Sequence, residues 1–198
     1  MDCGVLYSGG RDSTLAALVL EPLYDVTLVT GTFGITGVAD AGRAAAEAVG
    51  LPFETVALDR NVAGAAVEKM VEDGYPRNGI QSVHEHAVER LAAGEFAAIA
   101  DGTRRDDRVP TIDRPLAQSV EDRFEVDYLA PLTGFGRGAI DALATRALRV
   151  ETGPSEHIPT ADYETELRAL MREEYGEATV SDVFPVHTQS RVVGRQHD

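Results

Sequence analysis

The sequence predicts a three-layer α/β domain with a parallel sheet, and three observations lead there. Short runs of apolar and β-branched residues alternate along the chain with longer stretches of helical apolar spacing. Such alternation is typical of a parallel sheet covered by helices on both faces. The first strand-like run leads, through a turn with two adjacent glycines, directly into the first helix-like run. With 198 residues the chain is long enough for one such domain and an appendage.

Five segments have the composition of buried strands. The second is rich in β-branched residues and runs into a loop of glycines and threonines. The fourth and fifth are short but follow helical stretches, as the alternation requires. The strands are expected at residues 3–7, 25–30, 53–58, 96–100 and 127–129.

Helices are expected between and after these strands, and several carry start or stop signals. Residues 38–49 are rich in alanine and end before Gly50 and Pro52, which stop a helix. Residues 74–79 contain too many helix breakers to be anything but a loop. Asp113 is a candidate cap for a helix that begins near Pro115. The expected helices are 14–20, 38–49, 61–71, 80–91, one from 115, 139–148 and 161–175.

The character of the chain changes near residue 150. This predicts a sheet domain over residues 1–150 and a C-terminal helix and tail over residues 151–198. Residues 152–155 are expected to form a linker, and residues 180–198 show no periodicity. The amphipathic helix 161–175 is expected to pack either on the sheet domain or on a second subunit of a homodimer, and the sequence leaves both open.

The composition combines a net charge of −15 with an unusual choice of basic residues. Of the 18 basic side chains 17 are arginine, against 33 aspartates and glutamates. This bias resembles that of proteins from salt-loving organisms, in which acidic side chains solvate the surface. Multimolar salt shortens the Debye length to below ~3 Å, so the acidity does not exclude a tRNA partner.

Two further features of the composition exclude classes of protein. No apolar stretch reaches the ~20 residues of a membrane span, and Met1 leads straight into the first strand without a signal peptide. A cytoplasmic protein without a membrane partner is therefore expected. The single cysteine, Cys3, cannot form an intramolecular disulfide and is expected as a small core residue.

The glycine turn has the chemistry of an anion site. Its sequence is Tyr7-Ser8-Gly9-Gly10-Arg11-Asp12-Ser13. Adjacent glycines permit positive φ angles and the close approach of a ligand, and the helix that follows offers unpaired N–H groups. The two serines add hydroxyl donors, and Asp12 places a carboxylate where it would hold a cation that bridges phosphate oxygens. The turn therefore predicts a nucleotide site with Mg²⁺.

This turn is not a Walker A loop, because the lysine of that motif is absent. It resembles the S-G-G-x-D-[ST] PP-loop of the N-type ATP pyrophosphatases, a superfamily that includes asparagine synthetase and several tRNA-modifying enzymes. The matching positions are Ser8, Gly9, Gly10, Asp12 and Ser13, with Arg11 at the variable one. The resemblance implies the strand order 3-2-1-4-5 and ATP phosphates on residues 8–13.

The same resemblance implies a reaction and a place for the adenine. A substrate oxygen would attack the α-phosphorus, pyrophosphate would leave, and a nitrogen or sulfur nucleophile would then displace AMP. The adenine would lie at the exit of the second strand, with Thr30, Thr32 and Phe33 among its contacts. Arg137, at the start of the helix after the fifth strand, would reach a phosphate.

A second charged segment, residues 100–108, follows the fourth strand and should open beside the glycine turn, because ligands of parallel sheets bind at the carboxyl edge. Its three arginines and three carboxylates suit a phosphate clamp with Mg²⁺ ligands. It resembles the G-x-x-x-x-D-D segment of tRNA-thiolating PP-loop enzymes. The matching positions are Gly102, Asp106 and Asp107, and Thr103 follows the glycine.

The resemblance makes Asp12, Asp106 and Asp107 the expected catalytic residues, with Asp12 and Asp106 as the Mg²⁺ ligands. Arginines stand at Arg104 and Arg105, where the family often has histidines, and this leaves the acceptor open between a tRNA and a small carboxylate or amide. A sulfur or nitrogen transfer would need a separate donor protein, because no amidotransferase domain fits in 198 residues.

Other interpretations remain open. A nucleotide-binding regulator of the universal-stress type would bind ATP without adenylating, although its glycine signature is missing from residues 101–113. Residues 134–139 fit G-x-G-x-x-A, but no strand follows the helix to complete a dinucleotide-binding unit. His84 and His86 lie two apart on a helix and cannot face one metal, so they are expected as surface or packing residues. Residues 187–191 suit either substrate contacts or a solvated tail.

Overall fold

The computed structural model describes residues 1–155 and 157–196 and contains the expected three-layer α/β fold. All five strands of the main sheet run parallel, and their order is β3-β2-β1-β4-β5. The fold prediction is confirmed in strand number, direction and order. The strands are β1 (Asp2–Leu6), β2 (Asp25–Thr32), β3 (Phe53–Ala57), β4 (Ala98–Ala100) and β5 (Asp127–Leu129).

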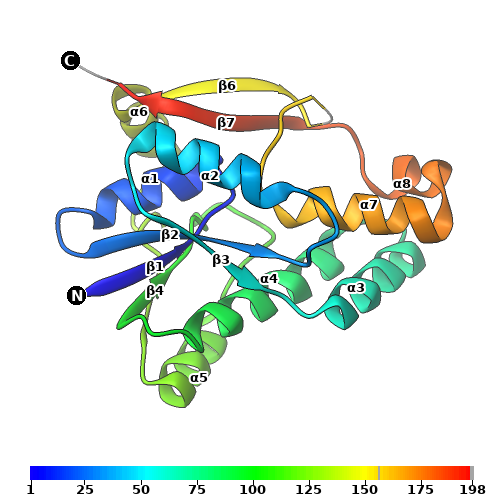
Figure 1. Cartoon of the computed structure of the whole chain (residues 1–198), viewed down its shortest axis with the longest axis horizontal. Coiled ribbons are helices and arrows are strands. Elements are labelled where there is room, and N and C mark those ends of the chain that lie inside the picture. Colours follow the sequence, from blue (N-terminus) through cyan, green and yellow to red (C-terminus); the bar gives the residue numbers. More distant parts are fainter. Residues whose placement is uncertain (156, 197–198) are drawn as a thin grey trace.

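Helices cover both faces of this sheet (Figure 1). The cap and stop signals operate where they were expected: Asp113 accepts a hydrogen bond from the Leu116 amide, and Gly50 ends its helix with a φ of +69°. The helices are α1 (Arg11–Leu20), α2 (Val38–Val49), α3 (Arg60–Asp73), α4 (Arg77–Ala92), α5 (Arg114–Phe124), α6 (Arg137–Ala147), α7 (Tyr163–Tyr175) and α8 (Glu177–Val183).

The side chains of the central strand divide the hydrophobic core in two. Cys3 and Val5 of β1 pack in one cluster with α1, α2 and α6, whereas Leu6 packs in another with α3, α4 and α7. This alternation follows from the two-residue period of a strand. Helices bury both faces of the main sheet, so a ligand can reach the sheet only at the ends of its strands, where polar groups follow.

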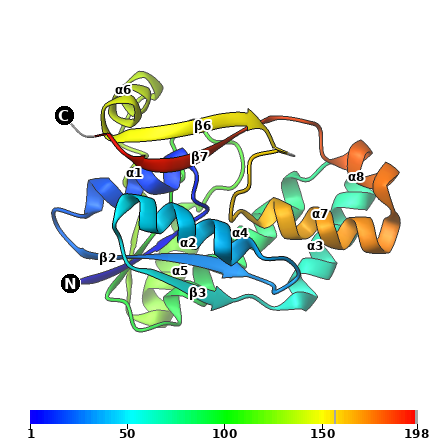
Figure 2. The ribbon, with the colours of Figure 1, turned by 45° about the horizontal axis from the view of Figure 1, so that its top comes forward.

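The C-terminal part differs from the expectation. The expected linker and the non-periodic tail form an antiparallel pair, β6 (Leu148–Pro154) with β7 (Thr188–Arg195), and the expected boundary at residues 150 and 151 falls inside β6. This pair lies over α1 and α2 as an outer layer (Figures 1 and 2). Most positions of β6 and β7 are exposed or half-buried, with Leu148 and Val192 among the few buried ones, so the apolar signal of a strand is weak in both.

The helix of the C-terminal segment packs on the sheet domain of its own chain. Leu167 and Met171 of α7 are fully buried in the cluster that contains α3, and α8 follows against the same helix (Figure 2). The structure thus settles where this helix packs, and both ends of the chain contribute to one core.

Glu166 of α7 is the most unusual buried residue in this region, with 1% exposure. Its carboxylate accepts hydrogen bonds from the amides of Phe33, Ile35 and Thr36 and from the Thr32 hydroxyl. A buried charge is tolerated when hydrogen bonds replace its water. Glu166 therefore ties α7 to the loop that follows β2.

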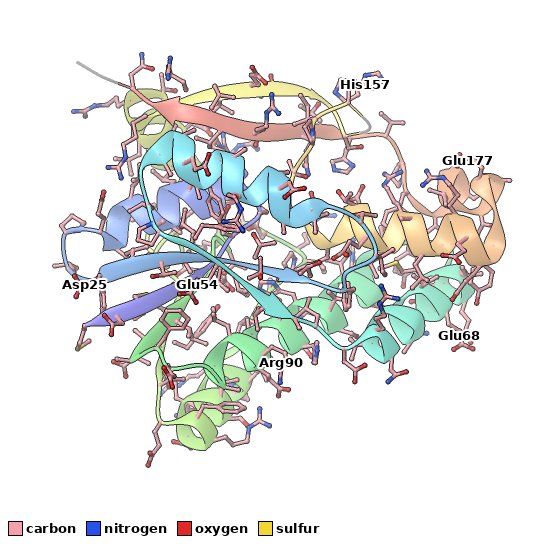
Figure 3. All side chains as sticks on the ribbon, viewed as in Figure 1. Asp25, Glu54, Glu68, Arg90, His157 and Glu177 are labelled. Atoms are coloured by element: carbon pink, nitrogen blue, oxygen red, sulfur yellow. The ribbon has the colours of Figure 1, made fainter. Side chains whose placement is uncertain are left out.

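The surface carries the acidic charge on many elements. Asp25, Glu54, Glu68 and Glu177 are exposed side chains on four different elements (Figure 3). Among the described residues, no helix is both long and apolar enough to cross a membrane. Cys3 is a buried, free thiol, as expected for a core residue.

Candidate functional site

A pocket of about 680 Å³ lies at the carboxyl end of the main sheet, in the size range of small-molecule sites. Its walls come from the glycine turn, the loop after β4, the start of α4 and two parts of the C-terminal segment. They include Leu6, Tyr7, Ser8, Gly10, Arg11, Asp12, Ser13, Gly31, Tyr75, Arg77, Ile80, His84, Asp101, Gly102, Thr103, Asp107, Arg108, Thr160, Asp162, Tyr163, Glu164, His187, Gln189 and Ser190.

The glycine turn has the geometry that its sequence predicts. Gly9 has a φ of +75°, a backbone conformation that residues other than glycine rarely adopt. The Gly10 amide donates to the Ser8 hydroxyl over 3.3 Å, and the Ser8 and Ser13 hydroxyl oxygens lie 3.2 Å apart. Gly10 caps α1 without a side chain, so the first turn of the helix opens toward the pocket.

The C-terminal segment supports the back of this turn. The Ala161 amide donates to the Ser8 carbonyl oxygen over 2.7 Å, and the Val192 amide donates to the Gly9 carbonyl oxygen over 2.9 Å. These bonds leave the inner side of the turn facing the pocket, which β7 also lines with Gln189 and Ser190. Residues 188–191 belong to β7, and His187, Gln189 and Ser190 line the pocket, so this segment is not a solvated tail.

The loop after β4 touches the glycine turn, as the shared sheet edge predicts. A Cβ atom built on Gly102 would lie 2.7 Å from the Ser13 amide nitrogen, so the two backbones are in direct contact. Arg104 joins the segments electrostatically. Its guanidinium donates to Asp107 over 2.7 Å and lies 3.4 Å from Asp12, and the hydrogen bond with Asp107 raises the pKa of Arg104.

Asp106 does not share this position. The Asp107 amide donates to the Arg104 carbonyl oxygen, which closes a tight turn with Asp106 at its exposed corner. The Asp106 side chain is 44% exposed, lies 3.8 Å from Arg104 and is not part of the pocket wall. The structure therefore places Asp107 beside the pocket and Asp106 outside it, against the expectation that both face it.

The residues expected around the adenine are also not where the sequence suggested. The buried Thr30 hydroxyl donates to the Tyr7 carbonyl oxygen over 2.7 Å, and Thr32 and Phe33 bind Glu166. Only Gly31 of this strand end lines the pocket. Arg137 is exposed at the start of α6, outside the pocket wall. The C-terminal helix, which sequence analysis treated as an appendage, occupies the β2 exit.

A buried polar cluster that was not expected from the sequence lies at the wall of the pocket. Asp101, at the end of β4, is 1% exposed, and its carboxylate lies 2.9 Å from the Nε2 atom of His84. It also accepts hydrogen bonds from the amide and hydroxyl of Thr103 and from the Tyr128 hydroxyl. A carboxylate directly after a buried strand is a signal that could have pointed to Asp101, but nothing local in the sequence connects it with His84.

Comparison with known proteins places the chain in a family. The model of a family of unknown function, DUF7411, matches residues 1–194. The chain belongs to the DUF7411 family. An uncharacterized protein of Methanocaldococcus jannaschii is 39% identical to it over 195 residues, which cover 98% of this chain and 96% of that protein.

A solved structure is similar to this DUF7411 chain over its whole length. It is the crystal structure of a predicted subunit of tRNA methyltransferase from Methanocaldococcus jannaschii, with a TM-score of 0.89 and 37% sequence identity. The match covers 100% of this chain and 99% of that chain. The strand pair β6–β7 and the C-terminal helices, which complete the pocket, thus lie within the shared fold.

Of the two carboxylates expected to hold Mg²⁺ in this DUF7411 site, Asp12 lines the pocket and Asp106 does not. Asp12 lines the pocket beside the glycine turn, and its oxygens face Arg11 at 2.9 Å and Arg104 at 3.4 Å. Among the described residues no group of three metal-ligating side chains is present. A nucleotide-bound Mg²⁺ takes most of its ligands from phosphate and water, so a single carboxylate such as Asp12 fits that ion.

Proposed function

We propose that the chain binds ATP on the glycine turn and transfers its adenylyl group to an acceptor with release of pyrophosphate. The observation that carries this proposal is the contact between the turn and the Gly102 segment in one pocket. Two motifs 90 residues apart in the sequence, each resembling a PP-loop ATP pyrophosphatase segment, meet at the Ser13 backbone. The pairing of β1 with β4 brings both segments to the same edge of the sheet, where one ligand can contact both.

The proposed arrangement assigns the phosphates to the residues of the turn. The Ser8 and Ser13 hydroxyls and the first turn of α1 would bind phosphate oxygens, and Asp12 would hold the Mg²⁺ that neutralises their charge. The adenine would lie on the apolar wall formed by Leu6, Gly31 and Ile80, in place of the contacts expected farther along the β2 exit. Such a site acts by positioning and charge stabilisation, which need no covalent nucleophile.

We propose an RNA acceptor, with a role in tRNA modification. Support comes from the structural relative described as a predicted tRNA methyltransferase subunit. Arg77 and Arg108 line the pocket, and Tyr75, with 46% exposure, adds an aromatic surface at its wall. Arginines for phosphates and an exposed ring for stacking are the residue types that bind single-stranded RNA.

The experiment that tests the adenylation follows the label of α-labelled ATP. The protein is incubated at high salt with Mg²⁺, ATP and tRNA from a strain that lacks the gene, and the nucleotide products are separated. AMP and pyrophosphate are expected, and Asp12→Asn should lower their formation by at least ~10²–10³. Asp122→Asn, at an exposed position of α5, is the matched control. An Asp12-dependent release of ADP would contradict the proposal.

A second candidate function is favoured because the structural relative is described as a predicted subunit. In that case the chain would be the ATP-hydrolysing member of a multi-chain enzyme, with the nitrogen or sulfur donor on a separate protein. Adding extract from the source cell to the same assay separates the two candidates, because AMP would form only with extract. Tight ATP binding without AMP under either condition would indicate a nucleotide-binding regulator.

A further inference from the structure

The buried cluster of His84 and Asp101 has the features of a proton-transfer pair. The two side chains are 6% and 2% exposed, and their hydrogen bond joins α4 to the end of β4. Both residues line the pocket. The adenylation site described above assigns no role to either residue. Burying an ionised carboxylate is costly unless it is fully hydrogen-bonded, so the pair calls for an explanation.

The hydrogen bonds of Asp101 fix the state of the pair. Burial alone would raise the pKa of Asp101, but the hydrogen bonds from His84 and Thr103 outweigh it and hold this pKa below its ordinary value. The carboxylate is therefore ionised and only accepts hydrogen bonds, so the shared proton sits on Nε2 of His84. In the neutral imidazole the other nitrogen, Nδ1, is then an acceptor.

The second ring nitrogen of His84 is not used by Asp101. No described residue forms a hydrogen bond with Nδ1 of His84. The ring is held from the side by Tyr163 of α7, whose ring centroid lies 6.0 Å away in an edge-on arrangement. His84 and Tyr163 both line the pocket, so the histidine ring lies at the pocket wall between α7 and the residue that follows β4.

The pair lies close to the proposed phosphate site. Asp101 directly precedes Gly102, whose backbone touches the Ser13 backbone in the glycine turn. His84 is thus connected to the turn through Asp101, the residue that follows β4, and through the contact of Gly102 with Ser13. A general base must lie within hydrogen-bond reach of the group that loses a proton, so the acceptor would have to bind in the part of the pocket that His84 lines.

Resting on the proposed function, we propose that His84 is the general base of the adenylation and that Asp101 is its positioning residue. The acceptor oxygen forms a bond to the α-phosphorus while the bond from that phosphorus to the leaving pyrophosphate breaks. For an amide-type acceptor, the neighbouring N–H proton moves to Nδ1 of His84 as the C=O bond becomes C–O and the C–N bond becomes C=N. Asp101 stabilises the imidazolium that results.

The presence of a base also narrows the class of acceptor. A carboxylate acceptor is already ionised near neutral pH and needs no base for attack on phosphorus. An amide or lactam oxygen becomes a good nucleophile only when the N–H proton leaves. The pair therefore favours an amide-type acceptor over the small carboxylate that the sequence left open.

The main test compares His84→Gln with a matched control on the same helix. Glutamine keeps an N–H donor near Asp101 but removes the basic nitrogen, so the fold and ATP binding should survive. Pyrophosphate release with tRNA from the gene-deletion strain should fall by about 10²–10⁴. His86→Gln is the control, since His86 accepts a bond from the Asp59 amide and lies outside the pocket wall.

Two readouts separate a base from a structural histidine. Added imidazole should restore part of the activity of His84→Gly, which no loss of packing alone would allow. The ¹⁵N chemical shifts of histidine-labelled wild-type protein should show His84 protonated on Nε2 and bare on Nδ1. Asp101→Asn should disturb this tautomer and lower the rate while ATP still binds.

The outcomes distinguish this proposal from the proposed function. Wild-type protein that forms no AMP with or without extract refutes the adenylation itself. Active wild-type protein combined with an active, folded His84→Gln variant refutes the base. A proton on Nδ1 of His84 in the spectrum also overturns it, and this measurement applies even if a variant fails to fold.

Discussion

Gly102→Ala tests the contact between the two motifs with the smallest change available. Gly102 does not have a left-handed backbone conformation, so alanine meets no φ penalty. Its Cβ atom, however, would lie 2.7 Å and 2.8 Å from the Ser13 amide nitrogen and Cα, and 2.9 Å from the Asp12 carbonyl carbon. All three neighbours are backbone atoms of the glycine turn, which cannot move aside like a flexible side chain.

The expected magnitude follows from these distances. An ordinary contact begins near 3.4 Å, so one of the two segments must move by about 0.7 Å. Overpacking of this kind costs about 1–3 kcal/mol, and for a chain of this size it lowers Tm by about 2–12 °C. Because a 1 Å misplacement of reacting groups costs about 10²-fold, AMP formation should fall by about 10-fold to 10²-fold.

The assay measures thermal unfolding and acceptor-dependent AMP formation on the same preparations. Gly64→Ala is the matched control, because a Cβ atom there meets nothing within 4 Å and the residue lies inside α3. That control should gain about 0.5–1 kcal/mol of stability and keep its activity. A Gly102→Ala variant with wild-type Tm and rate would show that the two segments do not touch as described.

Three further predictions concern buried groups. Glu166→Gln should lower the free energy of unfolding by about 1.5–3 kcal/mol in urea, since it removes the charge that binds the amides after β2, whereas exposed Glu174→Gln should change little. The pKa of Asp101 is held below its ordinary value of 3.8. Its ionised form therefore contributes stability above about pH 4, and this stability is lost as the pH falls through the folded pKa. Asp101→Asn should weaken the dependence of the free energy of unfolding on pH in acid. Burial raises the pKa of Cys3 to about 11, so a maleimide should label it at neutral pH far more slowly in the native protein than in urea.

Glu166 occupies the β2 exit, where the sequence led us to expect the adenine of a bound ATP. The amides of Phe33 and Ile35 are donors that a ligand would otherwise use, and here a carboxylate from α7 takes them. The base of a bound nucleotide must then rest on apolar contacts such as Leu6 and Ile80. The C-terminal segment is thus a structural part of the site.

Local sequence determined most of the main sheet and its ligand-binding edge. Strand and helix periods are local properties, and together with the right-handed crossover rule they lead to parallel strands covered on both faces. The glycine turn was visible for the same reason, because its backbone needs are met by consecutive residues such as Gly9 and Gly10. Asp12 and Asp107 both contact Arg104, which follows from their positions after neighbouring strands.

Tertiary structure alone decided the features that depend on residues far apart in the chain. The antiparallel pair of β6 and β7 places Val150 opposite Val192, and no local pattern predicts such a partner. The hydrogen bond between His84 and Asp101 and the binding of residues 33–36 by Glu166 likewise join segments that only packing brings together. Sequence thus fixes the groups at the strand ends, whereas the long-range packing of α4 and α7 decides which of them face the pocket, because burial and hydrogen bonding depend on neighbours in space.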